Sequence, residues 1–137
     1  MAADRVNSLV AQLAQPTRPD AARLAAVLGA VLTPSPDNPY WAFYTFTLGQ
    51  GPFAGGELRL SKTGAGAWLL LNPRDPPGLG EAEVDRAGWG PLVSLLPNPR
   101  IPPEGADTEV YELGGVTISV EWLHTSRRLR SLALEWQ

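Results

Sequence analysis

The chain has 137 residues, a length that suits one domain with a single hydrophobic core. Its formal charge of −3 argues against a dedicated binder of nucleic acid or of anionic membranes, because such proteins need a net basic surface. There is no cysteine, which excludes disulfides, thiolate metal sites and cysteine nucleophiles and fits a reducing compartment. Arginine replaces lysine almost everywhere, which is typical of a GC-rich bacterial genome. We therefore expect a cytoplasmic bacterial protein.

The N-terminal part of the chain is predicted to be helical. Over residues 4–14 the apolar side chains recur at the spacing of an amphipathic helix, and Pro16 ends the pattern. A second helix is predicted over residues 19–32, with Thr17 as its N-cap. The proline-rich segment 33–39 is then expected to form a rigid connector.

From Tyr40 onward the apolar pattern has a period of two, which indicates strands. Strands are predicted for residues 40–48, 57–61 and 67–72. The segment 49–56 is expected to be a loop, because four glycines and a proline in eight residues weaken a ladder. These strands form a first antiparallel meander, in which Leu58 is expected opposite Leu70 and Leu60 opposite Trp68.

Residues 74–107 interrupt the sheet. They contain a predicted helical turn at 81–86 and an extended proline-rich segment, 97–103, which we expect to pack along a sheet edge. The sheet restarts at Thr108, and Gly114-Gly115 is predicted to be a two-residue hairpin turn.

The last predicted hairpin has a polar tip at residues 124–128. Its expected register sets Trp122 opposite Arg130, because this pairing keeps the apolar side chains of both strands on one face. The accompanying pairs are Leu113 with Val116 and Tyr111 with Ile118 across the glycine turn, and Val120 with Leu132, Ile118 with Leu134 and Val116 with Trp136 across the last turn.

The predicted fold is a single α+β domain spanning residues 1–137, helical over 4–32 and a sheet over 40–136. Two N-terminal helices pack on a mostly antiparallel sheet of about six strands, arranged as two three-stranded meanders joined by a proline-rich crossover. This order of elements is similar to that of small acidic secretion chaperones and of bacterial immunity proteins, although the C-terminal helix of the chaperones is absent. The likeness is one of architecture and rests on no motif.

No catalytic, cofactor or metal site is predicted. His124 is the only histidine, and it lies on a hairpin tip, which is a poor platform for a precisely held base. The segment 49–55 begins as Gly-x-Gly but contains a proline and precedes a predicted strand, so it lacks the helix that would hold a phosphate. The only local acidic cluster, at 81–85, sits where a helix is expected to begin. We therefore predict that the protein is not an enzyme.

Basic and aromatic side chains in loops are the candidate partner-binding groups. Arginines on the hairpin tip can grip acidic groups of a partner, although Arg130 can instead cap the core by stacking on Trp122. Trp89 lies between two glycines and is either a loop anchor or an exposed recognition residue. Trp41 belongs to a strand that is apolar on both faces. The predicted partner-binding residues are Trp41, Trp89, His124, Arg127, Arg128 and Arg130.

Three functions remain open from the sequence. The leading hypothesis is a small non-catalytic module that binds another protein, in the manner of a chaperone, inhibitor or immunity protein. The first alternative is a small-molecule binder or minor enzyme with a pocket between helices and sheet, lined by Tyr40, Tyr44 and Tyr111. The second alternative is a subunit of a homo-oligomer, such as a homodimer, joined through an aromatic sheet face.

Overall fold

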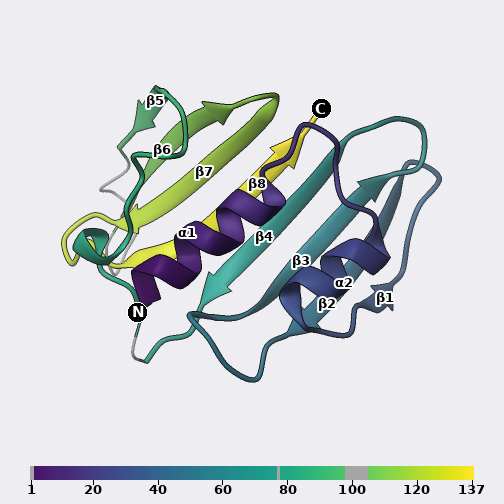
Figure 1. Cartoon of the computed structure of the whole chain (residues 1–137), viewed down its shortest axis with the longest axis horizontal. Coiled ribbons are helices and arrows are strands. Elements are labelled where there is room, and N and C mark those ends of the chain that lie inside the picture. The colour runs from purple at the N-terminus through teal and green to yellow at the C-terminus, as the bar shows by residue number, and fades with distance from the viewer. Residues whose placement is uncertain (1, 77, 98–104) are drawn as a thin grey trace.

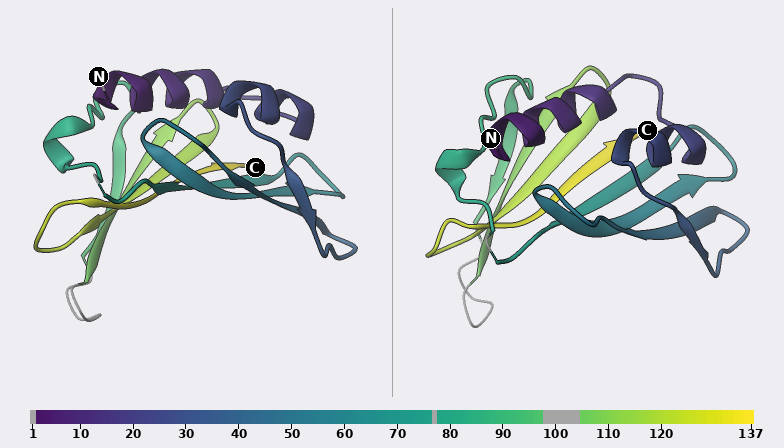
Figure 2. Two further views of the ribbon diagram at one scale, coloured as in Figure 1. Left: turned by 90° about the horizontal axis from the view of Figure 1, so that it is seen from below. Right: turned by 60° about the horizontal axis from the view of Figure 1, so that its bottom comes forward.

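One antiparallel sheet of eight strands carries two helices on one of its faces (Figures 1 and 2). This computed structural model describes residues 2–76, 78–97 and 105–137. It confirms the α+β class with an antiparallel sheet, whereas the expected number of about six strands is wrong. The helices are α1 (Ala2–Leu13) and α2 (Ala21–Leu28), and the strands are β1 (Thr33–Ser35), β2 (Trp41–Thr47), β3 (Phe53–Ser61), β4 (Ala67–Pro73), β5 (Leu92–Leu96), β6 (Ala106–Leu113), β7 (Val116–Leu123) and β8 (Leu129–Trp136).

The two additional strands lie at the two edges of the sheet, whose order is β1-β2-β3-β4-β8-β7-β6-β5. β1 occupies the beginning of segment 33–39, which was expected to be a connector. β5 lies within residues 74–107, which were expected to interrupt the sheet. Each meander therefore has four strands instead of three. The meanders meet at β4 and β8, the last strand of each, where Leu69 lies opposite Leu134. The expected proline-rich packing segment, 97–103, falls almost entirely outside the described residues.

Helix α2 is shorter than predicted at both ends. Its N-cap is Asp20, whose side chain accepts a hydrogen bond of 2.7 Å from the backbone N–H of Arg23, so Thr17 is not the cap. Its C-cap is Gly29, in the left-handed conformation with φ 66°. A residue without Cβ adopts this conformation at little cost, and the helix therefore stops before the chain turns into β1.

Strand β3 begins four residues earlier than predicted, because two of the expected loop glycines belong to it. Gly55 lies opposite Thr47, and Gly56 opposite Phe46 and Leu71. A Cβ on Gly56 would lie 1.8 Å from the carbonyl oxygen of Leu70, so the neighbouring backbone approaches to where a side chain would be. A bulge between Phe53 and Gly55 accommodates the change in pairing.

The register between β3 and β4 differs by one residue from the predicted one. Leu58 lies opposite Leu69, and Leu60 opposite Ala67. This pairing places the buried side chains of both strands on the face that the helices cover. In the second meander, five predicted pairs are confirmed: Leu113 with Val116, Tyr111 with Ile118, Val120 with Leu132, Ile118 with Leu134 and Val116 with Trp136. The predicted pair of Trp122 with Arg130 is wrong, because Trp122 lies opposite Leu129.

The core lies between the helices and the sheet. Val6, Val10 and Leu13 of α1 and Leu24 of α2 are each at most 2% exposed. They face a layer of buried strand side chains: Leu58, Leu69, Leu71, Ile118, Leu132 and Leu134. The indole of Trp136 donates a hydrogen bond of 2.9 Å to the carbonyl oxygen of Gln15, which ties the last strand to the segment after α1. No helix of the described residues lies on the opposite face of the sheet (Figure 2).

Candidate functional site

The helix-free face of the sheet carries a row of aromatic side chains around one arginine. Phe43 of β2, Arg59 of β3 and Trp68 of β4 lie directly opposite one another on adjacent strands. Because side chains alternate between the faces of a strand, these three point away from the buried Phe46, Leu58 and Leu69. The Arg59 guanidinium lies 4.5 Å from the ring centre of Trp68 and 5.6 Å from that of Phe43.

Two further apolar side chains extend this row. Trp41 has the same strand phase as Phe43, and Leu70 has the same phase as Trp68. We call the five residues Trp41, Phe43, Arg59, Trp68 and Leu70 the open face. Its apolar members are half-buried, while the side chain of Arg59 is 46% exposed. Trp41 is thus the one predicted partner-binding residue on this surface.

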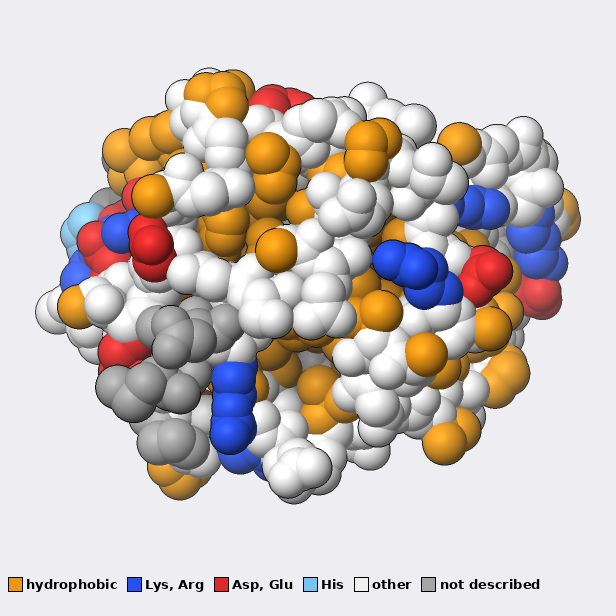
Figure 3. Space-filling model, in the orientation of Figure 1, with side chains coloured by type: hydrophobic (Ala, Val, Ile, Leu, Met, Phe, Trp, Pro, Cys, Tyr) orange, Lys and Arg blue, Asp and Glu red, His pale blue; other side chains and the backbone are white. Residues whose placement is uncertain are grey.

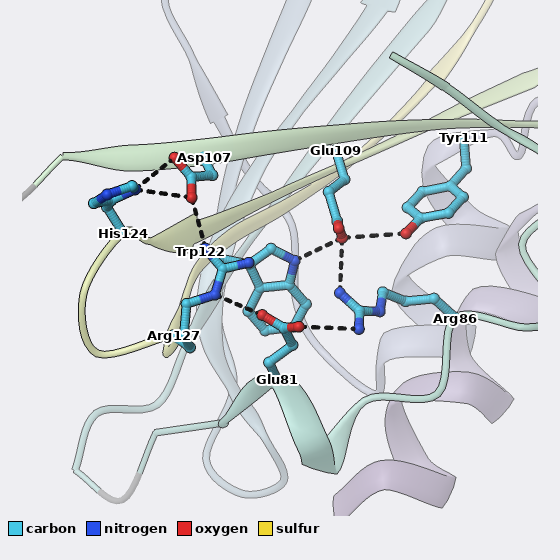
Figure 4. Close-up of polar contacts among 8 residues, drawn as sticks. All are labelled: Glu81, Arg86, Asp107, Glu109, Tyr111, Trp122, His124 and Arg127. Atoms are coloured by element: carbon cyan, nitrogen blue, oxygen red, sulfur yellow. Dashed lines mark hydrogen bonds and ion pairs between the residues drawn. The ribbon is translucent and has the colours of Figure 1, made fainter. Parts of the chain in front are cut away.

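A second cluster of charged side chains lies at the end of the second meander (Figure 4). At its centre the Oε1 atom of Glu109 accepts three hydrogen bonds, from Arg86 at 2.7 Å, Trp122 at 2.8 Å and Tyr111 at 3.1 Å. The Arg86 guanidinium also lies 5.0 Å from the ring centre of Trp122. Burial, followed by the nearby charge of Glu109, raises the pKa of the Tyr111 hydroxyl.

Arg127 connects this centre to the hairpin tip. Its Nε lies 2.6 Å from Oε2 of Glu81, and its Nη1 lies 2.6 Å from Oδ2 of Asp107. Burial acts to lower the pKa of Arg127, but the hydrogen bonds that it donates to these two carboxylates, together with their charges, outweigh burial and raise that pKa. Arg127 has a φ of 55°, a conformation uncommon for a residue with a side chain, so the hairpin backbone is shaped to bring the guanidinium between the carboxylates.

Most of the predicted partner-binding residues on the hairpin tip have partners within the molecule. His124 Nδ1 lies 3.0 Å from each oxygen of Asp107, a residue only 7% exposed. Arg128 pairs with Asp75 at 2.5 Å, and Arg127 is held as described above. The tip therefore forms an internal ion-pair network, in which Arg127 links Glu81 to Asp107 of β6 and Arg128 links the tip to Asp75.

The predicted stacking of Arg130 on Trp122 is wrong. A bulge in β8 sets Trp122 opposite Leu129 instead of Arg130, so the side chain of Arg130 is displaced from the core face. It lies 3.7 Å from Glu121 and is 49% exposed. Arg86, which no sequence motif marks, makes the stacking contact with Trp122 instead.

Trp89 is an anchor and not an exposed recognition residue. It is 3% exposed and packs edge-on against the ring of Tyr111, with the ring centres 5.6 Å apart. The following residue, Gly90, has a φ of 78°, and a Cβ there would lie 2.0 Å from the carbonyl oxygen of Glu112. The glycine therefore lets the loop lie close to β6 and bury the indole, which removes Trp89 from any docking surface.

The three tyrosines expected to line one pocket lie apart. The Tyr111 hydroxyl donates to Glu109, the side chain of Tyr40 is 65% exposed, and Tyr44 borders a shallow cavity of about 260 Å³ beside the open face. A cavity of about 440 Å³ does lie between the helices and the sheet, but none of the three tyrosines lines it. The three tyrosines therefore do not come together at the cavity between the helices and the sheet.

Sequence reasoning missed Phe43, Arg59, Trp68, Arg86 and Glu109. The signal available for Glu109 was the alternation of Asp107, Glu109 and Tyr111, which places polar groups on the core-facing phase of a strand, where they need partners.

No group of three or more His, Asp or Glu side chains in the described ranges is arranged to hold a metal ion. Within the same ranges, no helix combines the length and the apolar character that crossing a membrane requires.

Comparison with known proteins identifies a similar fold and no family. The sequence matches no protein-family model and no curated protein. Its structure is similar to that of a DUF4309 family protein, YjgB, from Bacillus subtilis, with a TM-score of 0.51. The alignment covers 99% of this chain and 98% of that chain at 13% identity, so the likeness concerns the fold alone.

Proposed function

We propose that this chain is a non-catalytic module that binds another protein through the open face. The observation that supports this proposal is the uncovered row of Phe43, Arg59 and Trp68, extended by Trp41 and Leu70. Tryptophan and arginine are the side chains that contribute most often to binding energy at protein interfaces. A sheet face with two tryptophans, a phenylalanine and a stacked arginine has this composition.

The stacking of Arg59 favours binding because it orders a long side chain in advance. A free arginine loses rotamer entropy when a partner immobilises it, whereas a guanidinium held between two rings has lost part of that entropy already. Glu57 is its only ion-pair partner among the described residues, at 3.7 Å with both side chains nearly half exposed. The partner we infer therefore presents an apolar surface with a carboxylate placed to meet Arg59.

A capture experiment with a charge-matched pair of variants tests the proposal. The immobilised wild-type protein is incubated with native lysate, and the bound proteins are identified by mass spectrometry. The variant Trp41→Ala with Arg59→Glu removes one aromatic side chain and reverses the charge of the open face. The control Val31→Ala with Arg23→Glu makes a similar change at exposed positions on the helix side, where Val31 is 83% exposed.

The expected result is one protein that binds the wild type and the control and is lost from the open-face variant. Circular dichroism of both variants checks that they are folded, and titration of the identified protein measures the affinity. We expect the open-face variant to bind at least about tenfold more weakly, because loss of an interface hot spot costs about 2 kcal/mol or more and about 1.4 kcal/mol is a tenfold change in affinity. Equal binding by the two variants would refute the assignment of the surface.

Self-association through β5 is a second candidate, carried by a separate observation. Leu92, Val93, Leu95 and Leu96 are between 51% and 58% exposed on a strand whose one pairing partner in the described part of the chain is β6. The opposite edge strand, β1, has three residues and contains Pro34, so it is protected against pairing. Light scattering over a range of concentrations is expected to detect dimers that the Leu95→Lys variant does not form. A wild-type protein that stays monomeric throughout would exclude this candidate.

A further inference from the structure

The cavity between the two helices and the sheet has a mostly apolar floor. It has a volume of about 440 Å³, which falls within the range of small-ligand sites. Leu9 of α1, together with Val27 and Leu28 of α2, forms one wall. Leu48, Pro52 and Phe53, at the end of β2 and the start of β3, form the other wall. Figure 3, which views the helix-covered face, shows apolar side chains at the bottom of a hollow beside the helices.

Polar side chains line only part of this cavity, and most of them come from one stripe of α1. Arg5, Ser8 and Gln12 follow one another at helical spacing, and the amide of Gln12 donates a hydrogen bond of 3.1 Å to the Ser8 hydroxyl. Gln50 lies on the opposite side. Among the residues whose side chains the structure describes, none forms an ion pair with Arg5, and Arg5 itself is exposed.

The charge of the lining is opposite to that of the whole chain. The sequence has 14 acidic and 11 basic residues. Nevertheless, the described residues that line this cavity include no carboxylate, and Arg5 is their one charged member. An apolar floor beside a single cation complements a ligand that combines an apolar chain with one negative charge.

We propose that this cavity binds an unbranched alkyl carboxylate, a ligand of the medium-chain fatty-acid class. The carboxylate accepts hydrogen bonds from the Arg5 guanidinium, close to the Ser8 hydroxyl and the Gln12 amide. The alkyl chain lies between the walls formed by Leu9, Val27 and Leu28 and by Leu48 and Phe53, and its removal from water contributes to the affinity. This site is distinct from the open face and does not depend on the binding of a protein there.

Decanoate and 1-decanol, each below the concentration at which it aggregates, are the probes for the test. They share the alkyl chain and differ in the charged group. Binding is followed by amide chemical shifts in two-dimensional NMR spectra of the ¹⁵N-labelled full chain. Decanoate is expected to shift the amides of Leu9, Val27 and Leu48 saturably, and decanol is expected to bind about tenfold more weakly because it lacks the charge-assisted contact.

The variant Arg5→Gln removes the proposed contact at an exposed position, so the fold is expected to persist. It should reduce decanoate affinity about tenfold and leave decanol affinity unchanged. The matched control Arg23→Gln makes the same charge change on α2, outside the cavity lining, and should bind decanoate as the wild type does. Equal affinity for decanoate and decanol, wild-type decanoate affinity in Arg5→Gln, shifts confined to the open face, or no saturable shift would each overturn the proposal.

Discussion

At the scale of single residues, Glu109 explains how a carboxylate can occupy the core-facing side of a strand. Its side chain is only 15% exposed, and burial of a charge without partners would be costly. Arg86, Trp122 and Tyr111 supply a charged and two neutral donors to one oxygen. The Arg86 guanidinium also covers the ring of Trp122, so the same contacts that stabilise the charge also seal the end of the core.

Replacement of Glu109 by glutamine tests the contribution of this charge. The amide oxygen can still accept a hydrogen bond from Trp122, but Arg86 loses its closest carboxylate. We expect the free energy of unfolding to fall by about 2 kcal/mol, as for other hydrogen bonds to charged groups. Urea unfolding measures the change. The control is Glu112→Gln, at an exposed position of the same strand, and we expect it to change the free energy of unfolding by less than about 0.5 kcal/mol. An equal loss of stability in both variants would contradict the prediction.

Glu81 predicts a dependence of stability on pH. Burial acts to raise the pKa of its carboxyl, but the hydrogen bond and charge of Arg127, together with Arg86, outweigh burial and hold that pKa below the ordinary value of 4.5. Because the folded-state pKa is lowered, the stabilisation is complete well above pH 4.5 and is lost as the pH falls below it. Unfolding free energies measured between pH 7 and pH 3 should therefore decrease less steeply for Glu81→Gln than for the wild type. Parallel curves would refute this role of Glu81.

At the scale of elements, β-bulges in β8 and β3 decide which side chains face the core and where a strand begins. The bulge in β8 displaces Arg130 from the core face and leaves the ring of Trp122 to Arg86. In β3, a bulge and two glycines let the strand continue where composition predicts a loop. In both strands, backbone geometry that pairs poorly in isolation is stabilised by the neighbouring strands.

The close approach at Gly56 leads to a prediction for strand β3. A methyl group there would meet the carbonyl oxygen of Leu70, so Gly56→Ala must displace the backbone of β4. We expect a loss of about 2 kcal/mol or more in the free energy of unfolding, as for overpacked cores. Thermal and urea unfolding measure it. Gly64→Ala is the control, since the nearest heavy atom to its Cβ would be Ser61 Oγ at 3.9 Å, and it should leave stability unchanged or slightly raised.

At the scale of the whole molecule, the two meanders depend on each other. Among the described residues, β4 and β8 supply the only strand pairing between the two meanders, with five residue pairs from Ala67–Trp136 to Leu71–Leu132. Helix α1 lies over β8, near the junction of the two meanders (Figure 1). Its buried side chains belong to one hydrophobic cluster with those of both halves of the sheet. The core is therefore shared by the two meanders.

A fragment of residues 1–76 tests this dependence. Without β8, strand β4 becomes an edge, and the buried side chains of Leu69 and Leu71 lose the neighbours that cover them. We expect the fragment to show no cooperative thermal transition and little dispersion of its amide signals. Addition of a second fragment with residues 78–137 is expected to restore both. A cooperative transition of the first fragment alone would show instead that the first meander is an independent domain.

The sequence by itself determined the class of fold, the glycine turn at 114–115 and most of the register of the last hairpin, because helical and strand periodicities are local properties of the chain. It also identified Trp41, Trp89 and the arginines of the hairpin tip as candidate partner-binding residues. Only the tertiary structure decided the burial and the contacts of individual residues. Contacts between segments far apart in the chain decide three features. They bury Trp89, place Arg86 over the ring of Trp122, and hold Gly55 and Gly56 in a strand. The open face has the same origin, since Phe43, Arg59 and Trp68 become neighbours only when three strands pair in one register.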